Sequence, residues 1–376
     1  MPEGINHEPQ DPRAPLSRKH PVSDVGGTPR NLPPHPTSRR DPRRDETAGG
    51  GMMTGVPMPS PLPVKNGVGP TRLRVPTSGP WATIAAYVVA RFDHLDADDL
   101  YRRFDAGEIV GSDGSAIGRG TALGAHRFVW YYRDLPVEEP MPFHEEILHV
   151  DDDLVVIDKP HFLPTTPGGR YLRESALVRL RTRLDNPDLT PIHRLDRATA
   201  GLVMFSARPA TRGAYQSLFE KRRVVKVYEA VSARPPGWDP DAPALAGRAL
   251  PIVYRNHIEA RRGELRVVVD NFREPNAETV VDVSGTGVSA SGRAVLHTVL
   301  RPHTGRMHQL RVHLAALGAG ILGDRWYPDL LPEAPDDHSL PLQLLARELE
   351  FSDPLSGTPR RFVTRRTLCE APVSGR

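Results

Sequence analysis

The chain has 376 residues and a formal net charge of +3, from 49 Lys and Arg against 46 Asp and Glu. At roughly 100–200 residues per domain, this length predicts about two domains. No apolar run approaches the 18 or so residues that span a bilayer, and the first residues lack the apolar stretch of a signal peptide. The single cysteine, Cys369, excludes an internal disulfide framework and a cysteine-rich zinc site. We therefore expect a soluble, cytoplasmic protein.

Residues 1–75 are rich in Pro, Gly, Ser, Thr and Arg, and we expect them to form a disordered tail. The first 80 residues contain 17 of the 40 prolines and no aromatic side chain, and they carry 11 basic against 7 acidic residues. Paired arginines at 39–40 and 43–44 could contact a polyanion, although a solvated tail is the preferred interpretation. Methionines at 52, 53 and 58 leave open a start of the native protein within this segment.

Residues 76–135 are expected to form a small α+β module. The apolar pattern of residues 81–91 predicts a helix, and Asp96 is a candidate cap for a second helix. Residues 107–114 resemble a strand and turn, and residues 126–133 resemble another strand.

The charge of the chain is unevenly distributed after this module. Residues 134–158 contain nine acidic residues and no Lys or Arg, whereas residues 170–226 contain 13 basic against 5 acidic residues. Such opposite blocks predict one face for a polyanion and another face exposed to solvent.

Residues 140–376 are predicted to form one larger domain in which strands are interrupted by a few helices. Strands are expected at 154–158, 201–206, 224–231, 265–269, 279–283 and 294–300, and helices at 175–184, 211–222 and near 308–317. This order predicts an α+β fold with a mixed, mostly antiparallel sheet core flanked by helices.

The first cluster of polar residues with possible chemistry lies around Asp196. This aspartate stands between Arg194 and Arg197, just before a buried-looking strand. A lone aspartate is more often a cap or an ion-pair partner than a catalytic group. Neighbouring guanidinium groups would keep the carboxylate ionised, as a nucleophile or a general base requires.

The second cluster follows Arg222 and Arg223 in a predicted strand. Lys226 and Tyr228 share one face of that strand. The tyrosine suits a place in the core, and on a positively charged face it could equally stack on a nucleic-acid base.

The third cluster covers residues 301–315, where a Thr304-Gly305 turn precedes a predicted helix. The helix N-terminus and Arg306 suit a phosphate or a carboxylate. His308 and His313 are separated by five residues, which places them about 140° apart around a helix at about 100° per residue. Because ligands at positions i and i+4 share a face and these two do not, we expect no metal site here.

These clusters, in this order, resemble the RluA-like family of RNA pseudouridine synthases. His193-Arg-Leu-Asp196 with Thr199 and Gly201 is similar to the catalytic-aspartate motif of the family, Lys226-Val-Tyr228 to the second motif, and residues 304–313 to the third. Residues 157–163, 321–327 and 344–354 are similar to further family segments. The sequence departs from the family at Ala200, where serine is common, and at Leu345, where histidine is common. The resemblance covers about residues 140–370, and more weakly the 76–135 module, which is similar to a small RNA-binding domain.

The resemblance implies an isomerase that detaches uracil from its ribose, rotates it and rejoins it through ring carbon 5, without a cofactor or a metal. Asp196 would act as the nucleophile or as the base that removes a ribose proton. By the same resemblance, Arg306 would pair with Asp196. Tyr228 would stack on the uracil and assist proton removal, and Arg194 would fill the space of the flipped base.

Further residues are expected to bind the RNA substrate, an rRNA or a tRNA, and the protein is expected to be monomeric. These substrate-binding candidates are His193, Arg194, Arg197, Arg222, Arg223, Lys226, His308 and Arg311. The alternative function is a catalytically inactive RNA-binding or ribosome-assembly factor on the same fold, against which the presence of Asp196, Tyr228 and Arg306 argues. A metal-dependent hydrolase is disfavoured by the histidine spacing.

Overall fold

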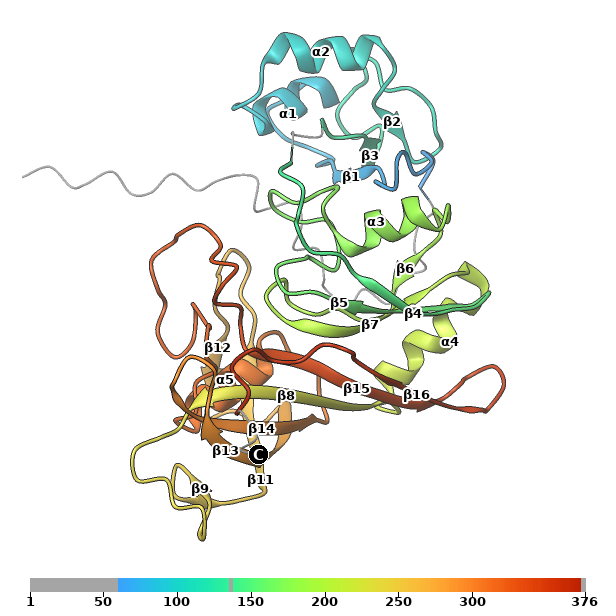
Figure 1. Cartoon of the computed structure of the whole chain (residues 1–376). Helices are drawn as coiled ribbons and strands as arrows, with labels where there is room; N and C mark the ends of the chain where they lie inside the picture. Colours follow the sequence, from blue (N-terminus) through green and yellow to red (C-terminus); the bar gives the residue numbers. More distant parts are fainter. Residues whose placement is uncertain (1–59, 135–137, 373–376) are drawn as a thin grey trace, which may run out of the picture. The chain divides into compact units, whose positions relative to one another are not determined.

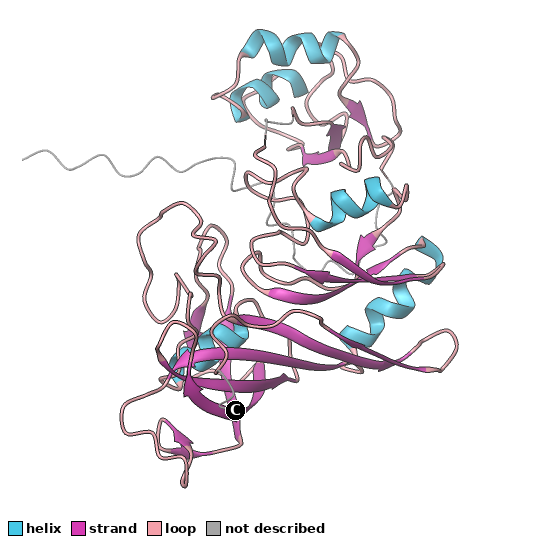
Figure 2. Cartoon of the chain, viewed as in Figure 1, coloured by secondary structure: helices cyan, strands magenta, loops and turns pink. Residues whose placement is uncertain are grey.

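The computed structural model describes residues 60–134 and 138–372, and the expected tail at 1–59 lies outside this range. The five helices in the described range are short and separate, and strands and loops form most of the rest (Figure 2). The helices are α1 (Ile84–Arg91), α2 (Ala97–Asp105), α3 (Ala176–Arg183), α4 (Pro209–Glu220) and α5 (Gln309–Ala316). No helix in the described range is long and apolar enough to cross a membrane.

The strands belong to a three-stranded sheet, a two-stranded hairpin and one large sheet. The first sheet contains β1 (Thr71–Arg74), β2 (Val110–Gly111) and β3 (Phe128–Tyr131), and the hairpin contains β9 (Ala244–Leu245) and β10 (Arg248–Ala249). The large sheet contains β4 (Glu146–Val150), β5 (Leu154–Lys159), β6 (Thr190–Pro191), β7 (Ala200–Ser206), β8 (Val225–Ala233), β11 (Ile252–Glu259), β12 (Val268–Asp270), β13 (Ala277–Val288), β14 (Ala294–Pro302), β15 (Leu344–Ser352) and β16 (Pro359–Val363).

In the small module, α1 and α2 pack against the three-stranded sheet, and together they enclose an apolar core. Asp96 caps α2 as predicted, because its carboxylate accepts hydrogen bonds from the backbone of Asp98 and Asp99. The expectation of a tail through residue 75 is wrong for its last part. β1 pairs with β3, and Leu73 and Val75 are buried in the core of the module. Alternating apolar side chains in a short strand can bury enough surface to order it, even in a proline-rich context.

The large sheet is mixed and mostly antiparallel, as the sequence predicts. Its strand order is β12-β11-β13-β14-β8-β15-β7-β5-β4, with β16 paired to β15 and β6 paired to β7. Among the described strands, the parallel contact is the short one between β15 and β7, where Leu345 lies opposite Ala200 and Ala346 opposite Gly201. This contact joins two groups of strands: β4, β5 and β7 on one side and β8, β11, β13 and β14 on the other (Figure 1).

Each group of strands has its own apolar core. The core of the first group includes Ile157, Leu180 and Phe205, and the core of the second includes Leu296 and Leu314. Burying such a side chain stabilises the fold by about 1.5–3 kcal/mol. The side chain of Tyr228 is partly buried and packs against both cores. The line where the two groups of strands meet therefore carries both the end of the Asp196 loop and a tyrosine of the second motif.

Most predicted elements occur within two residues of their expected bounds. β1, β4, β6, β9, β10, β11 and β16 were not predicted, and the strand expected at 265–269 is β12 at Val268–Asp270. β11 carries a buried asparagine, Asn256, on its inward face, so its sequence does not show a simple alternation of apolar and polar residues.

Arginines from elsewhere in the chain pair with much of the expected acidic face. Arg366 reaches the fully buried Asp158 at 3.3 Å, and Arg208 reaches Asp153 at 2.7 Å. Further pairs join Asp151 to Arg360 and Glu145 to Arg179. Much of the acidic block is therefore paired within the fold. Its partners include Arg179 and Arg208 of the basic block.

Candidate active site

Asp196 lies on the loop that connects β6 to β7. The loop is anchored on both sides of the aspartate: Thr165 Oγ1 donates to the Leu195 carbonyl at 3.0 Å, and the Thr199 amide donates to the Asp196 carbonyl at 3.0 Å. Beyond the loop, Gly201 adopts a φ of 110°, and a Cβ at this position would lie 2.3 Å from the Ala346 carbonyl oxygen of β15. Glycine is therefore required where the loop enters the junction between the two groups of strands.

The Asp196 side chain is 31% exposed and faces a buried arginine from α5. Arg311 Nη1 lies 3.4 Å from Asp196 Oδ2. The same guanidinium binds Asp324 through two shorter hydrogen bonds, 2.7 Å from Nε and 2.6 Å from Nη2. Arg311 and Asp324 are 5% and 1% exposed, so the guanidinium is held by a buried carboxylate and presents its remaining edge to Asp196.

This pairing corrects the prediction for Arg306. The Arg306 side chain is exposed, and its Nε donates to the Asn276 carbonyl at 3.2 Å. Arg306 and Arg311 lie in the same motif, and their positions relative to α5 determine which of them reaches Asp196. Arg306 lies in the turn before α5, and its side chain is exposed. Arg311 lies within α5, and its side chain is buried.

His308 lies beside the same aspartate at the start of α5. Its Nε2 is 3.8 Å from Asp196 Oδ2, and its Nδ1 shares a 3.0 Å hydrogen bond with the Tyr327 hydroxyl. Burial lowers the pKa of His308, although the Asp196 carboxylate acts in the opposite direction. The lowered pKa favours the neutral ring, which lies beside Asp196 at a distance beyond that of a hydrogen bond.

Tyr228 and Lys226 lie on β8. Burial, reinforced by the negative charge of Asp196, raises the pKa of Tyr228, so its hydroxyl stays protonated at neutral pH. Lys226 Nζ donates to the Thr304 carbonyl at 3.0 Å, and burial lowers its pKa to about 8. The lysine thus ties the second motif to the turn of the third.

The remaining predicted residues differ in what they contact. His193 is used by the fold: its Nε2 accepts the Met204 amide at 3.2 Å, and its ring stacks on Phe219 with a centroid distance of 4.6 Å. Burial lowers its pKa to about 3. His193 therefore holds the loop, and its contact with substrate stays a prediction. Arg197 pairs with Asp336. The side chains of Arg194, Arg222 and Arg223 are exposed.

One buried cation near the site was not predicted. Lys159, at the end of β5, is fully buried, and its Nζ donates to the carbonyls of Leu163 at 2.8 Å, Pro160 at 3.0 Å and Arg197 at 3.3 Å. Burial lowers its pKa to about 7, while the Asp196 charge acts to raise it. The segment 157–163 resembles the family, and a lysine at the end of a mostly apolar strand was the signal that could have singled it out.

The histidines of the third cluster have protein partners. His313 binds Thr279 through Nδ1 at 3.0 Å and Asn256 through Nε2 at 2.8 Å. Within residues 60–134 and 138–372, no group of three His, Cys, Asp or Glu side chains is placed to hold a metal ion.

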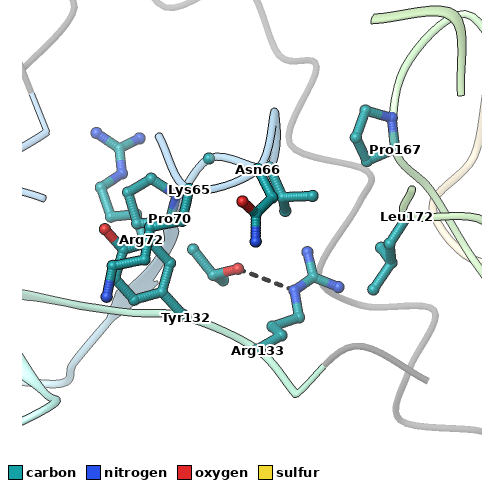
Figure 3. A pocket seen from close by; sticks show the side chains of 11 residues that line it. Lys65, Asn66, Pro70, Arg72, Tyr132, Arg133, Pro167 and Leu172 are labelled. Atoms are coloured by element: carbon teal, nitrogen blue, oxygen red, sulfur yellow. Dashed lines mark hydrogen bonds between the residues drawn. The ribbon is translucent and has the colours of Figure 1, made fainter. Parts of the chain in front are cut away.

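A pocket of about 380 Å³ lies apart from these residues (Figure 3). It is lined mainly by residues 65–72 together with Tyr132 and Arg133 of the small module, and by Pro167 and Leu172. Arg133 Nε donates to Thr71 Oγ1 at 2.8 Å within it. None of the residues of the Asp196 site lines this pocket.

Known proteins similar to this chain include several RNA-modifying enzymes. Residues 153–316 match the family described as RNA pseudouridylate synthase. The dual-specificity RNA pseudouridine synthase RluA of Salmonella typhimurium is 31% identical over 219 residues, which cover 57% of this chain and 90% of that protein. RluA of Escherichia coli is 32% identical over 218 residues with the same shares. An uncharacterised RNA pseudouridine synthase of Synechocystis sp. is 28% identical over 245 residues, 63% of this chain and 76% of that protein.

These similarities span the strands and loops that bring Asp196, Arg311 and Tyr228 together, and they confirm the resemblance seen in the motifs. The chain belongs to the RluA-like family of RNA pseudouridine synthases, and it is an isomerase that modifies RNA.

Proposed function

We propose that this enzyme converts a uridine of rRNA or tRNA to pseudouridine with Asp196 as its essential catalytic group. The observation that carries the proposal is the environment of the carboxylate. It is one-third exposed, on an anchored loop, and a buried guanidinium lies 3.4 Å from it. A carboxylate in this setting faces a buried cation and is accessible to a nucleotide, as both the nucleophilic and the basic role require.

The other residues follow from the position of Asp196. Arg311 orients the carboxylate from the α5 side, and His308 lies beside it. Tyr228 provides a ring surface for the uracil. Because the pKa of Tyr228 is raised, its hydroxyl is a phenol at neutral pH, and it can take the proton from ring carbon 5 only by passing its own proton onward.

Access to the target base requires the nucleotide to leave its stack. Arg194 is exposed and lies two residues before Asp196, where it could occupy the vacated position. Arg222 and Arg223 are exposed at the start of β8 and supply phosphate contacts, which position the RNA and do not select its sequence. The small module at 76–135 adds a further RNA-binding surface.

The experiment is the Asp196→Asn variant. It keeps the size and most hydrogen bonds of the side chain and removes the charge. We expect pseudouridine formation to be abolished while the affinity for RNA changes by less than about threefold. Pseudouridine mapping in total RNA from cells with and without the gene identifies the RNA, and single-turnover assays on that RNA measure the variant. Substantial turnover by Asp196→Asn contradicts the assignment, and an inactive wild-type enzyme that still binds RNA supports the assembly-factor alternative.

A further inference from the structure

The guanidinium of Arg197, the residue that follows the proposed catalytic aspartate, is paired with a carboxylate of the same chain. Its Nη1 lies 2.9 Å from Asp336 Oδ2, and its Nη2 lies 2.5 Å from Asp336 Oδ1. Two nearby groups share this carboxylate: Arg170 Nη2 at 3.3 Å and the Tyr171 hydroxyl at 3.2 Å. One carboxylate is thus bound by two guanidinium groups and a hydroxyl, a donor set that suits a phosphate equally well.

Apart from this contact, the segment that carries Asp336 is attached at its start, where the Leu331 amide donates to the Arg325 carbonyl at 2.8 Å and Arg325 Nη2 donates to the Pro332 carbonyl. Every residue from Leu331 to Leu340 is exposed except Asp336, which is partly buried. The ring of His338 adds contacts with Phe143 and Phe162, at centroid distances of 5.1 and 4.9 Å. A loop that buries so little apolar surface can leave its position at a low free-energy cost.

Arg197 has several contacts besides Asp336. Arg197 Nη1 also donates to the Phe162 carbonyl at 3.3 Å. Its guanidinium lies over the rings of Tyr171 and Phe162, at 5.2 and 5.8 Å from their centroids. These contacts come from the connection between β5 and α3, so they do not depend on the 331–340 loop.

We propose that Arg197, Arg170 and the Tyr171 hydroxyl form a binding site for a backbone phosphate of the RNA substrate, which Asp336 occupies until RNA displaces the 331–340 loop. This inference rests on the proposed function, because it places the phosphate next to the nucleotide that reacts at Asp196. Exchange of one anion for another leaves both arginines paired before and after binding. In free enzyme the carboxylate competes with RNA, and only an RNA that makes further contacts displaces it.

The experiment compares Asp336→Asn with Asp337→Asn. Both variants remove one negative charge from the same loop, but the Asp337 carboxylate binds Ser339 and not the arginines. The probe is a fluorescein-labelled, unmodified tRNA transcript, since a contact to the backbone is independent of sequence. We expect Asp336→Asn to bind it about three- to tenfold more tightly than wild type, as removal of a competing ion pair predicts, and Asp337→Asn to bind within about twofold of wild type.

A second variant keeps the test decisive if Asp336→Asn folds poorly. Arg170 is 70% exposed, so Arg170→Gln does not disturb the core. If Arg170 contacts a phosphate, this variant binds the tRNA more weakly, and the slope of log affinity against log salt becomes shallower by about one. Unchanged slope and affinity in Arg170→Gln, or Asp336→Asn binding no tighter than Asp337→Asn, overturns the proposal.

The outcome is separable from that of the proposed function. Pseudouridine formation by wild type together with unchanged binding by Asp336→Asn rejects the phosphate site alone. Tighter binding by Asp336→Asn without pseudouridine formation by wild type on any RNA rejects the proposed function.

Discussion

At the scale of single residues, the Asp196–Arg311 contact is asymmetric. The arginine is almost fully buried, and its two shortest hydrogen bonds go to Asp324, leaving one edge at 3.4 Å from Asp196. Asp324 therefore balances the buried charge and sets the plane of the guanidinium, while Asp196 remains accessible. Complete removal of the arginine would leave Asp324 buried and unpaired, at a cost of about 3–5 kcal/mol.

This geometry predicts that Arg311→Lys keeps the fold but impairs catalysis. A lysine retains the positive charge, but its single nitrogen cannot bind Asp324 in the same bidentate way and also reach Asp196. We expect the single-turnover rate of pseudouridine formation to fall on the order of 100-fold, with RNA affinity changed by less than about threefold. Rapid-quench assays and fluorescence anisotropy measure the two quantities.

The matched control is Arg306→Lys, five residues earlier in the same motif. Arg306 is exposed and donates to a backbone carbonyl, so we expect its replacement to change the rate by less than about threefold. A larger fall in rate in Arg306→Lys than in Arg311→Lys would restore the assignment that the motif alone suggested.

At the scale of elements, α5 is attached to the sheet by buried polar contacts as well as by apolar packing. Gln309 Nε2 donates to Thr279 Oγ1 at 2.9 Å, and the same hydroxyl contacts His313 Nδ1 at 3.0 Å. His313 Nε2 then binds Asn256 Oδ1 of β11 at 2.8 Å. The neutral ring satisfies both contacts by donating from Nε2 and accepting at Nδ1, whereas a protonated ring cannot accept.

These contacts predict an acid-sensitive helix. Burial lowers the pKa of His313 to about 4, below the unfolded value of about 6.5. Between these two values the unfolded chain binds more protons than the native chain, so the free energy of unfolding falls as the pH is lowered through this window. We expect His313→Gln to reduce this pH dependence by up to about 1.4 kcal/mol per pH unit. Urea denaturation between pH 4.5 and 7 measures it, and parallel curves for the variant and wild type would contradict the prediction.

At the scale of the whole molecule, the order of charges along the chain does not map directly onto its surface. Much of the acidic stretch is paired with arginines distant in sequence, as in the pairs Asp158–Arg366 and Asp153–Arg208. Within the basic stretch, Arg179 and Arg197 are also paired. We therefore expect the exposed arginines at 222–223 to contribute more of the attraction for RNA than the total charge suggests.

This distribution predicts how salt affects RNA binding. Removing one arginine that binds a phosphate makes the slope of log affinity against log salt shallower by about one. We expect Arg222→Gln and Arg223→Gln each to show this change for a tRNA transcript. Arg361→Gln, which replaces an exposed arginine paired with Glu348, serves as the control with an unchanged slope. If all three variants have the same slope of log affinity against log salt as wild type, the 222–223 surface is excluded as an RNA contact.

The sequence was sufficient to predict the fold class, most of the strands and helices, the family, and the motifs that contain Asp196, Tyr228 and Arg311. These features depend on local pattern and on the spacing of residues within motifs, both of which are present in the chain before it folds. Chain order could not predict which arginine reaches Asp196, because both lie in one motif and only the packing of α5 distinguishes them. Nor could it show that Lys159 contacts the Arg197 carbonyl, that the acidic block is paired, or that Asp336 binds Arg197, since these contacts join residues 34 to 209 positions apart. Pairing at such separations is decided by the register of the sheet and the paths of its loops, and only the tertiary structure determines those.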